Sequence, residues 1–108
     1  MPTSSEVFNE INNRLQADPS KVKGINANYA FDLSGEDSGQ YHINLKDGAA
    51  DVGEGLPENP NITITMKSDD FVQLAEGKLD PTMAFMSGKI KIKGDMGLAM
   101  KLQTVLSA

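Results

Sequence analysis

The clearest structural signal in the chain is an alternation of apolar and polar residues between positions 25 and 46. The apolar side chains recur at every second position, as Ile25, Ala27, Tyr29, Phe31 and Leu33 and then as Tyr41, Ile43 and Leu45. Successive side chains of a strand point to opposite faces, so this period predicts two strands with one buried face. The polar, glycine-containing segment 34–39 separates them and predicts a hairpin.

Three further segments complete the predicted sheet. We expect a weak edge strand over 49–54, a fourth strand over 62–66, and a fifth over 89–93, where lysine and isoleucine alternate. Clean alternation is typical of sheets with one covered and one wet face, so the sheet should be mainly antiparallel.

Helical periodicity flanks and interrupts these strands. Apolar residues recur at helical spacing over 4–16, after a capping box formed by Thr3 and Glu6. Ser68 is expected to cap a helix over 69–76, Asp80-Pro81 to begin one that runs as far as Gly88, and Asp95 to cap one that reaches Leu106. Because no repeat or linker divides the chain, residues 1–108 are predicted to form one α+β domain.

Composition excludes several classes of protein. The 108 residues include 15 acidic and 10 basic side chains and no cysteine. A net charge of −5 lacks the positive field of a general nucleic-acid binder, and without cysteine there is no disulfide or thiolate metal site. No apolar run approaches the roughly 18 residues that span a bilayer, and the start of the chain does not resemble a signal peptide. We expect a soluble, intracellular monomer.

The C-terminal segment 95–106 is more apolar than a helix covering one sheet face requires. The arc contains Leu98, Ala99, Leu102, Val105 and Leu106, and Met96 and Met100 widen it. One interpretation is a helix buried on most sides. The other is a ligand cavity whose adaptable wall contains Met83, Met86, Met96 and Met100. Gln103 would then be a lone polar group that hydrogen-bonds the ligand.

Three sequence motifs carry a resemblance to a known family. They are LDP at 79–81, AFMSGKIKIKGD at 84–95 and LAMKLQ at 98–103, supported by the opening helix and by the segment 68–71. Together they closely resemble sterol carrier protein-2 domains. The resemblance implies a five-stranded sheet of order 3-2-1-4-5, covered on one face by helices that enclose an apolar tunnel. It also implies binding and transfer of sterols, fatty acids, fatty acyl-CoAs or phospholipids.

The resemblance and the apolar arc together give a set of candidate lipid-binding residues. They are Phe71, Leu74, Met83, Phe85, Met86, Ile90, Met96, Leu98, Met100, Leu102, Gln103, Val105 and Leu106. The last helix would close the tunnel, so ligand exchange should require that helix to shift. The family's peroxisomal members end in a small-basic-Leu tripeptide, whereas this chain ends Leu106-Ser107-Ala108. We therefore expect a cytoplasmic location, with the peroxisome as the alternative.

Two groups of cations have competing interpretations. Arg14, Lys21 and Lys23 are candidates for binding an acyl carboxylate or a CoA phosphate, Arg14 foremost because its fork can hold a carboxylate through two hydrogen bonds; the alternative is solvated surface. Alternation places three lysines on one face of the strand over 89–93. This row either solubilises and protects a sheet edge or makes transient contact with anionic membranes.

Catalysis finds little support in the residues. His42 is the chain's single histidine and falls on the polar face of a predicted strand, and no nucleophile elbow or metal-ligand spacing is present. No cofactor is expected. The sequence favours a non-enzymatic lipid carrier; the alternatives are a module that presents lipid to a larger enzyme and an esterase that would have to use His42.

Overall fold

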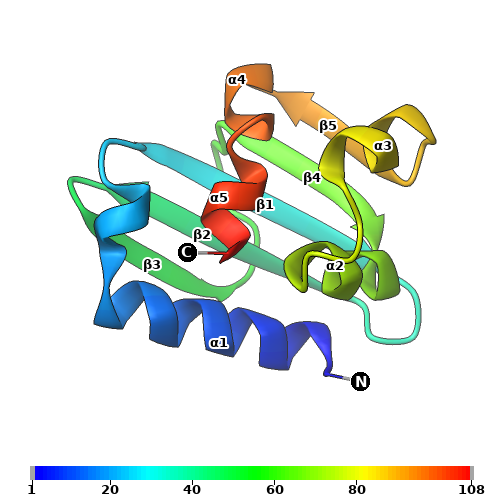
Figure 1. The fold of residues 1–108 in the computed structure, drawn as a ribbon, viewed down its shortest axis with the longest axis horizontal. Helices are drawn as coiled ribbons and strands as arrows, with labels where there is room; N and C mark the ends of the chain where they lie inside the picture. Colours follow the sequence, from blue (N-terminus) through cyan, green and yellow to red (C-terminus); the bar gives the residue numbers. More distant parts are fainter. Residues whose placement is uncertain (1, 108) are drawn as a thin grey trace.

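A five-stranded sheet forms the frame of the protein in the computed structural model, which describes residues 2–107 (Figure 1). The strands are β1 (Ala27–Ser34), β2 (Gly39–Lys46), β3 (Ala49–Glu54), β4 (Ile62–Lys67) and β5 (Ile90–Gly94). Their order is β3-β2-β1-β4-β5, as the resemblance implied. Three neighbouring pairs are antiparallel, and the central pair β1 and β4 is parallel. The mainly antiparallel α+β fold is therefore confirmed, with one parallel pair.

Helices cover one face of this sheet and one of its edges. They are α1 (Ser4–Ala17), the 3-10 helix η1 (Pro19–Val22), α2 (Ser68–Ala75), α3 (Pro81–Met86), α4 (Met96–Ala99) and α5 (Leu102–Ser107). In Figure 1, α1, α2 and α5 lie over the sheet, whereas α3 and α4 lie by its β5 edge. The predicted capping box is confirmed: Glu6 N donates to Thr3 Oγ1 at 3.1 Å, and Thr3 N donates to Glu6 Oε1 at 3.3 Å.

The expected cap at Ser68 is wrong. Ser68 is the buried first residue of α2, and Lys67 precedes the helix without capping it through a side-chain hydrogen bond. The Ser68 hydroxyl packs closely against Gly35, so close that a β-carbon at that glycine would lie 3.3 Å from it. Packing against the β1–β2 turn thus takes the serine away from a capping role.

The prediction of a single C-terminal helix is also wrong. The segment divides into α4 and α5, with Met100 and Lys101 between them. The carbonyl of Leu98 accepts hydrogen bonds from Lys101 N at 3.1 Å and from the hydroxyl of Tyr29 at 2.7 Å. The first bond spans three residues instead of four, which tightens the turn. The second anchors this turn to the centre of the sheet.

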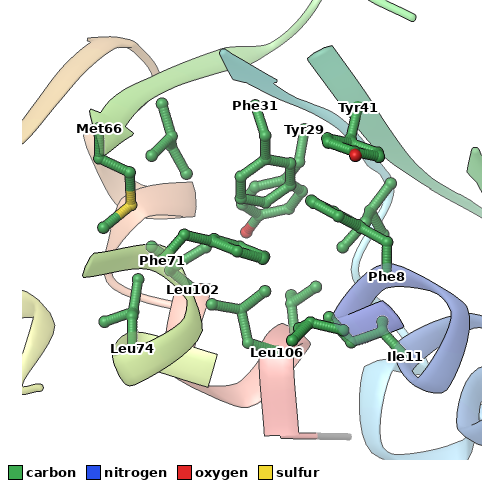
Figure 2. Close-up of a cluster of buried hydrophobic side chains, with 14 of the residues drawn as sticks. Phe8, Ile11, Tyr29, Phe31, Tyr41, Met66, Phe71, Leu74, Leu102 and Leu106 are labelled. Atoms are coloured by element: carbon green, nitrogen blue, oxygen red, sulfur yellow. The ribbon is translucent and has the colours of Figure 1, made fainter. Parts of the chain in front are cut away.

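The core lies between the sheet and α1, α2 and α5, and aromatic rings fill its centre (Figure 2). The Phe8 ring stacks on Tyr41 and Phe71, with centroids 4.2 and 4.7 Å apart, and meets Phe31 edge-on at 5.3 Å. Leu102, Val105 and Leu106 of α5 complete this core and are at most 1% exposed. The hydrophobic face of α5 is therefore used for the protein's own packing.

The other face of the sheet is only partly wet. Ala30 points to this face yet is 1% exposed, and its cross-strand partner His42 is half-buried. His42 Nδ1 lies 3.0 Å from the carbonyl oxygen of Gly55, in the connection from β3 to β4. This connection reaches the outer face, which the alternation alone did not predict. Ala108, on which the expectation about peroxisomal import depends, lies outside the described residues.

Candidate functional site

Large apolar side chains gather at the surface in one part of the molecule. The exposed ones among residues 2–107 are Leu56, Met83, Phe85, Met86, Met96 and Met100. Five of these six lie between positions 83 and 100, on α3, on α4 and directly after α4. Met86 and Met100 are 80% and 87% exposed. A concentration of this kind marks an interaction surface or ligand groove, since single exposed apolar residues are normally scattered.

An apolar groove of about 180 Å³ lies among these side chains. Its walls are Pro81, Thr82 and Phe85 of α3, Ile90 and Ile92 of β5, Met96 and Ala99 of α4, then Met100, and Leu102 of α5. Thr82 supplies the one polar side chain in this lining. In this structure the hollow is a groove open to solvent, because two of its walls, Met96 and Met100, are 49% and 87% exposed.

Aspartate caps hold the two short helices that flank the groove. Asp80 accepts a hydrogen bond from Met83 N at 3.0 Å at the start of α3, where Pro81 is the first helical residue. Asp95 accepts one from Gly97 N at 2.8 Å at the start of α4. Such caps offset the unpaired amides of a helix start, which matters most in helices of one or two turns. The two helices that flank the groove are therefore each begun by an aspartate that can be read from the sequence.

A second hollow adjoins the groove and is more polar. It has a volume of about 520 Å³ and shares Pro81, Thr82, Ala99 and Met100 with the groove. Its other walls are Gly77, Lys78, Leu79, Asp80 and Gln103. An apolar groove that continues into a hollow of mixed polarity matches the chemistry of an amphiphile, whose chain and head group prefer different surroundings.

The structure separates the candidate lipid-binding residues into four groups. Phe85, Ile90, Met96, Met100 and Leu102 line the groove, and Gln103 lines the adjoining hollow. Phe71, Leu74, Val105 and Leu106 belong to the buried core, and Leu98 packs against it. Met83 and Met86 are exposed outside the groove lining. Contact of any of these residues with lipid remains a prediction.

Sequence reasoning left Pro81, Thr82, Ile92 and Ala99 out of the candidate set, although all four line the groove. Ile92 could have been found, because it shares the inward face of β5 with Ile90. Ala99 lies in the predicted apolar arc. The helix start at Pro81 and Thr82 carries a folding signal, and nothing in that signal indicates a ligand.

The three head-group candidates lie elsewhere. Arg14 donates from Nη2 to the carbonyl oxygen of Leu106 at 2.8 Å, and its Nη1 lies 3.0 Å from Glu10 Oε1. This arginine therefore links α1 to the last turn of α5. Lys21 and Lys23 are exposed, and none of the three lines the groove or the adjoining hollow. Their role in binding a head group remains a prediction.

Tyr29 connects the core to the groove. Its ring is buried beneath the helices, and its hydroxyl donates to the carbonyl oxygen of Leu98 at 2.7 Å. Burial, and next to it the negative charge of Asp95, raise the pKa of Tyr29 to about 12. The hydroxyl therefore keeps its proton at neutral pH and remains a donor that anchors α4.

The described part of the chain offers few residues for catalysis or metal binding. His42 lies on the outer face of β2, as predicted, with Nε2 3.8 Å from Asp51 Oδ2. Residues 2–107 contain no group of three or more histidine, aspartate or glutamate side chains placed to hold a metal ion. No helix in the same range has the length and apolarity needed to cross a bilayer.

The fold and the groove together define a class of protein, an α+β domain with a surface site for an apolar or amphiphilic ligand. Within that class the chain belongs to the SCP-2 sterol transfer family, whose family model matches residues 8–107. The resemblance carried by the three motifs is thereby confirmed. Lipid binding and transport are the properties for which this family is known.

Relatives of known sequence or structure agree with this assignment. Hydroxysteroid dehydrogenase-like protein 2 of Danio rerio is 45% identical over 95% of this chain, which spans 25% of that protein. Sterol carrier protein 2 of Yarrowia lipolytica, solved in its apo form, is 30% identical with a TM-score of 0.79, covering 95% of this chain and 88% of that one. Sterol carrier protein-2 of Aedes aegypti, solved in complex with palmitate, has the same fold with a TM-score of 0.73 at 21% identity, covering 99% and 97%.

Proposed function

We propose that this domain is a non-enzymatic lipid carrier. It binds a fatty acid, a fatty acyl-CoA or a sterol in the groove between α3, β5 and the C-terminal helices, and transfers it between membranes or enzymes. The observation that carries the proposal is the apolar groove with an adjoining, more polar hollow. The palmitate complex of the Aedes aegypti protein supports it, because the same fold there accommodates a long acyl chain.

Burial of the hydrocarbon supplies the affinity in this proposal. Each methylene removed from water contributes about 0.8 kcal/mol, so an acyl segment of about ten methylenes gains about 8 kcal/mol before association costs. Met96 and Met100 are exposed without ligand and have flexible thioether side chains, so they can close over a bound chain. Gln103 and Lys78 then bind the head group in the polar hollow.

A second function is favoured by the relatives. This chain spans 25% of the dehydrogenase-like protein of Danio rerio, so the domain occurs there as part of a larger protein. In that setting it would present lipid to a larger lipid-metabolising enzyme. Transfer of a fluorescent fatty acid between vesicles by this chain alone supports the carrier. Binding of the fatty acid without transfer favours the presenting module.

Titration with a fluorescent long-chain fatty acid tests the groove itself. Ala99→Trp fills the groove and should displace about two methylenes, a loss of about tenfold in affinity. Ala49→Trp is the matched control, because Ala49 is exposed and lies outside the groove lining. Absence of uptake by the unmodified chain would overturn the proposal, and so would equal affinity in Ala99→Trp.

A further inference from the structure

Lysines concentrate at one edge of the sheet although the chain is acidic overall, with a net charge of −5. Lys89, Lys91 and Lys93 are exposed and alternate with the inward isoleucines of the edge strand β5. Lys67 ends the neighbouring strand β4, directly after Met66, which pairs with Ile90. These four lysines, the lysine edge, therefore lie together at the end of the sheet order where β5 has no further neighbour.

The lysine edge has no acidic partners in the described structure. The ion pairs within residues 2–107 join Arg14 to Glu10, His42 to Asp51 and Lys78 to Glu76. Asp69 and Asp70 follow Lys67 in the first turn of α2 and form no ion pair with it. Asp95 is occupied in capping Gly97, and Asp32 is one strand further in, as the partner of Thr65. The positive charge of this edge is thus available to an external anion.

Five of the six exposed large apolar residues lie on the other side of the same strand. Met83, Phe85 and Met86 come from α3, and Met96 and Met100 from α4 and the turn after it. We refer to these five residues as the apolar rim. Both helices pack against β5 (Figure 1), so β5 separates the rim from the lysine edge. The mouth of the groove opens within the rim, because Phe85, Met96 and Met100 belong to both.

We propose that the apolar rim and the lysine edge form a docking surface for an anionic phospholipid bilayer. This inference rests on the proposed function, since it gives the carrier an orientation. The methionines and Phe85 enter the acyl region, while the lysines extend along the flank to the phosphate groups. The groove then opens directly to the hydrocarbon, and a lipid chain enters it without crossing water.

Charge complementarity favours a bilayer over a second copy of this chain. A lysine near an anionic bilayer contributes about 1 kcal/mol, whereas an isologous dimer through this corner would bring two lysine edges together in repulsion. The acidic remainder of the surface is repelled by the same bilayer, so the edge also fixes the orientation. Flexible methionines suit a fluid partner, which has no fixed pockets to match.

Vesicle flotation tests the docking surface with the 108-residue chain. We expect binding to phosphatidylcholine vesicles that contain phosphatidylserine, and much weaker binding to phosphatidylcholine alone. Lys91→Gln with Lys93→Gln should weaken binding about 30-fold, the equivalent of about 1 kcal/mol for each lysine. Lys21→Gln with Lys23→Gln is the charge-matched control and should retain binding. Met86→Asp should also abolish binding, whereas Leu56→Asp should not.

Three results would overturn the docking surface: equal binding to both kinds of vesicle, an equal loss in the two lysine pairs, or a dimer that Met86→Asp dissociates. Fatty acid titration in the absence of vesicles separates this proposal from the carrier itself. The Lys91 and Lys93 variant should bind fatty acid with unchanged affinity. Fatty acid binding without vesicle docking refutes the docking surface alone, and docking without fatty acid binding refutes the carrier.

Discussion

The middle of the sheet and its β5 edge use apolar residues in opposite ways. Over β1 and β2, the Phe8 ring stacks on Tyr41 and on Phe71 with centroid distances below 5 Å, and this packing excludes water. Next to β5, methionines of α3 and α4 stay exposed around an open groove. Rigid rings fill a fixed space at high density, while thioether chains adapt to a changing one. The comparison indicates that stability is concentrated in the middle of the sheet, whereas the β5 edge is the place where the proposed function puts ligand exchange.

The C-terminal segment shows the same contrast within a few residues. Leu102, Val105 and Leu106 are at most 1% exposed, whereas Met96 and Met100 are 49% and 87% exposed. All five fall on one widened helical arc in the sequence. The tight turn after α4 redirects the chain between them, so one apolar arc serves both the core and the groove.

The largest expected effect is on core stability. Phe71→Ala removes a fully buried ring and should lower the free energy of unfolding by about 3–5 kcal/mol. Phe85→Ala removes the same ring from the groove, where it is 44% exposed, and should cost less than about 1.5 kcal/mol. Urea unfolding measures both. Equal losses would show that the groove wall is as much a part of the core as Phe71.

A smaller effect is expected where the two regions meet. Tyr29→Phe leaves the carbonyl of Leu98 without its 2.7 Å hydrogen bond and should destabilise the protein by about 1–2 kcal/mol. Hydrogen exchange of the α4 amides should accelerate more than that of α1. Uniform acceleration would mean that Tyr29 supports the whole fold and does not anchor α4 in particular.

The pKa of Tyr29 also gives the stability a dependence on alkaline pH. Its pKa is raised to about 12 in the folded protein, against about 10 in the unfolded chain. The unfolded state loses this proton first, so stability is complete below about pH 10 and falls as the pH rises toward 12. Tyr41, whose pKa burial also raises, adds to the same trend. Tyr29→Phe should make the decline of stability with pH shallower. An unchanged slope would contradict the assignment of the raised pKa to Tyr29.

The smallest effect is expected on the apolar rim. Met86 is 80% exposed, so Met86→Ser should change the free energy of unfolding by less than about 0.5 kcal/mol. Thermal unfolding measures it against Met66→Ser, a substitution of the same kind at a residue that is 3% exposed and should lose several kcal/mol. A large loss in Met86→Ser would show that the rim is part of the packed structure.

Period and turn chemistry predicted the five strands, the opening capping box and the starts of α3 and α4. These features depend on neighbours in the chain, so their signals are local. The break between α4 and α5 lies next to the hydrogen bond from Tyr29 to Leu98, which joins residues distant in sequence and which no local pattern indicates. Helical spacing likewise placed Leu106 and Met100 on one arc and could not show that one faces the core and the other the groove.

The burial of α5 has a consequence for synthesis of the protein on the ribosome. Leu106 is fully buried and its carbonyl accepts the hydrogen bond from Arg14 near the start of the chain. The nascent chain therefore cannot complete its hydrophobic interior until residue 106 has left the exit tunnel. Until then the rings of β1 and β2 remain uncovered and open to chaperones, and folding of this domain waits for its last helix.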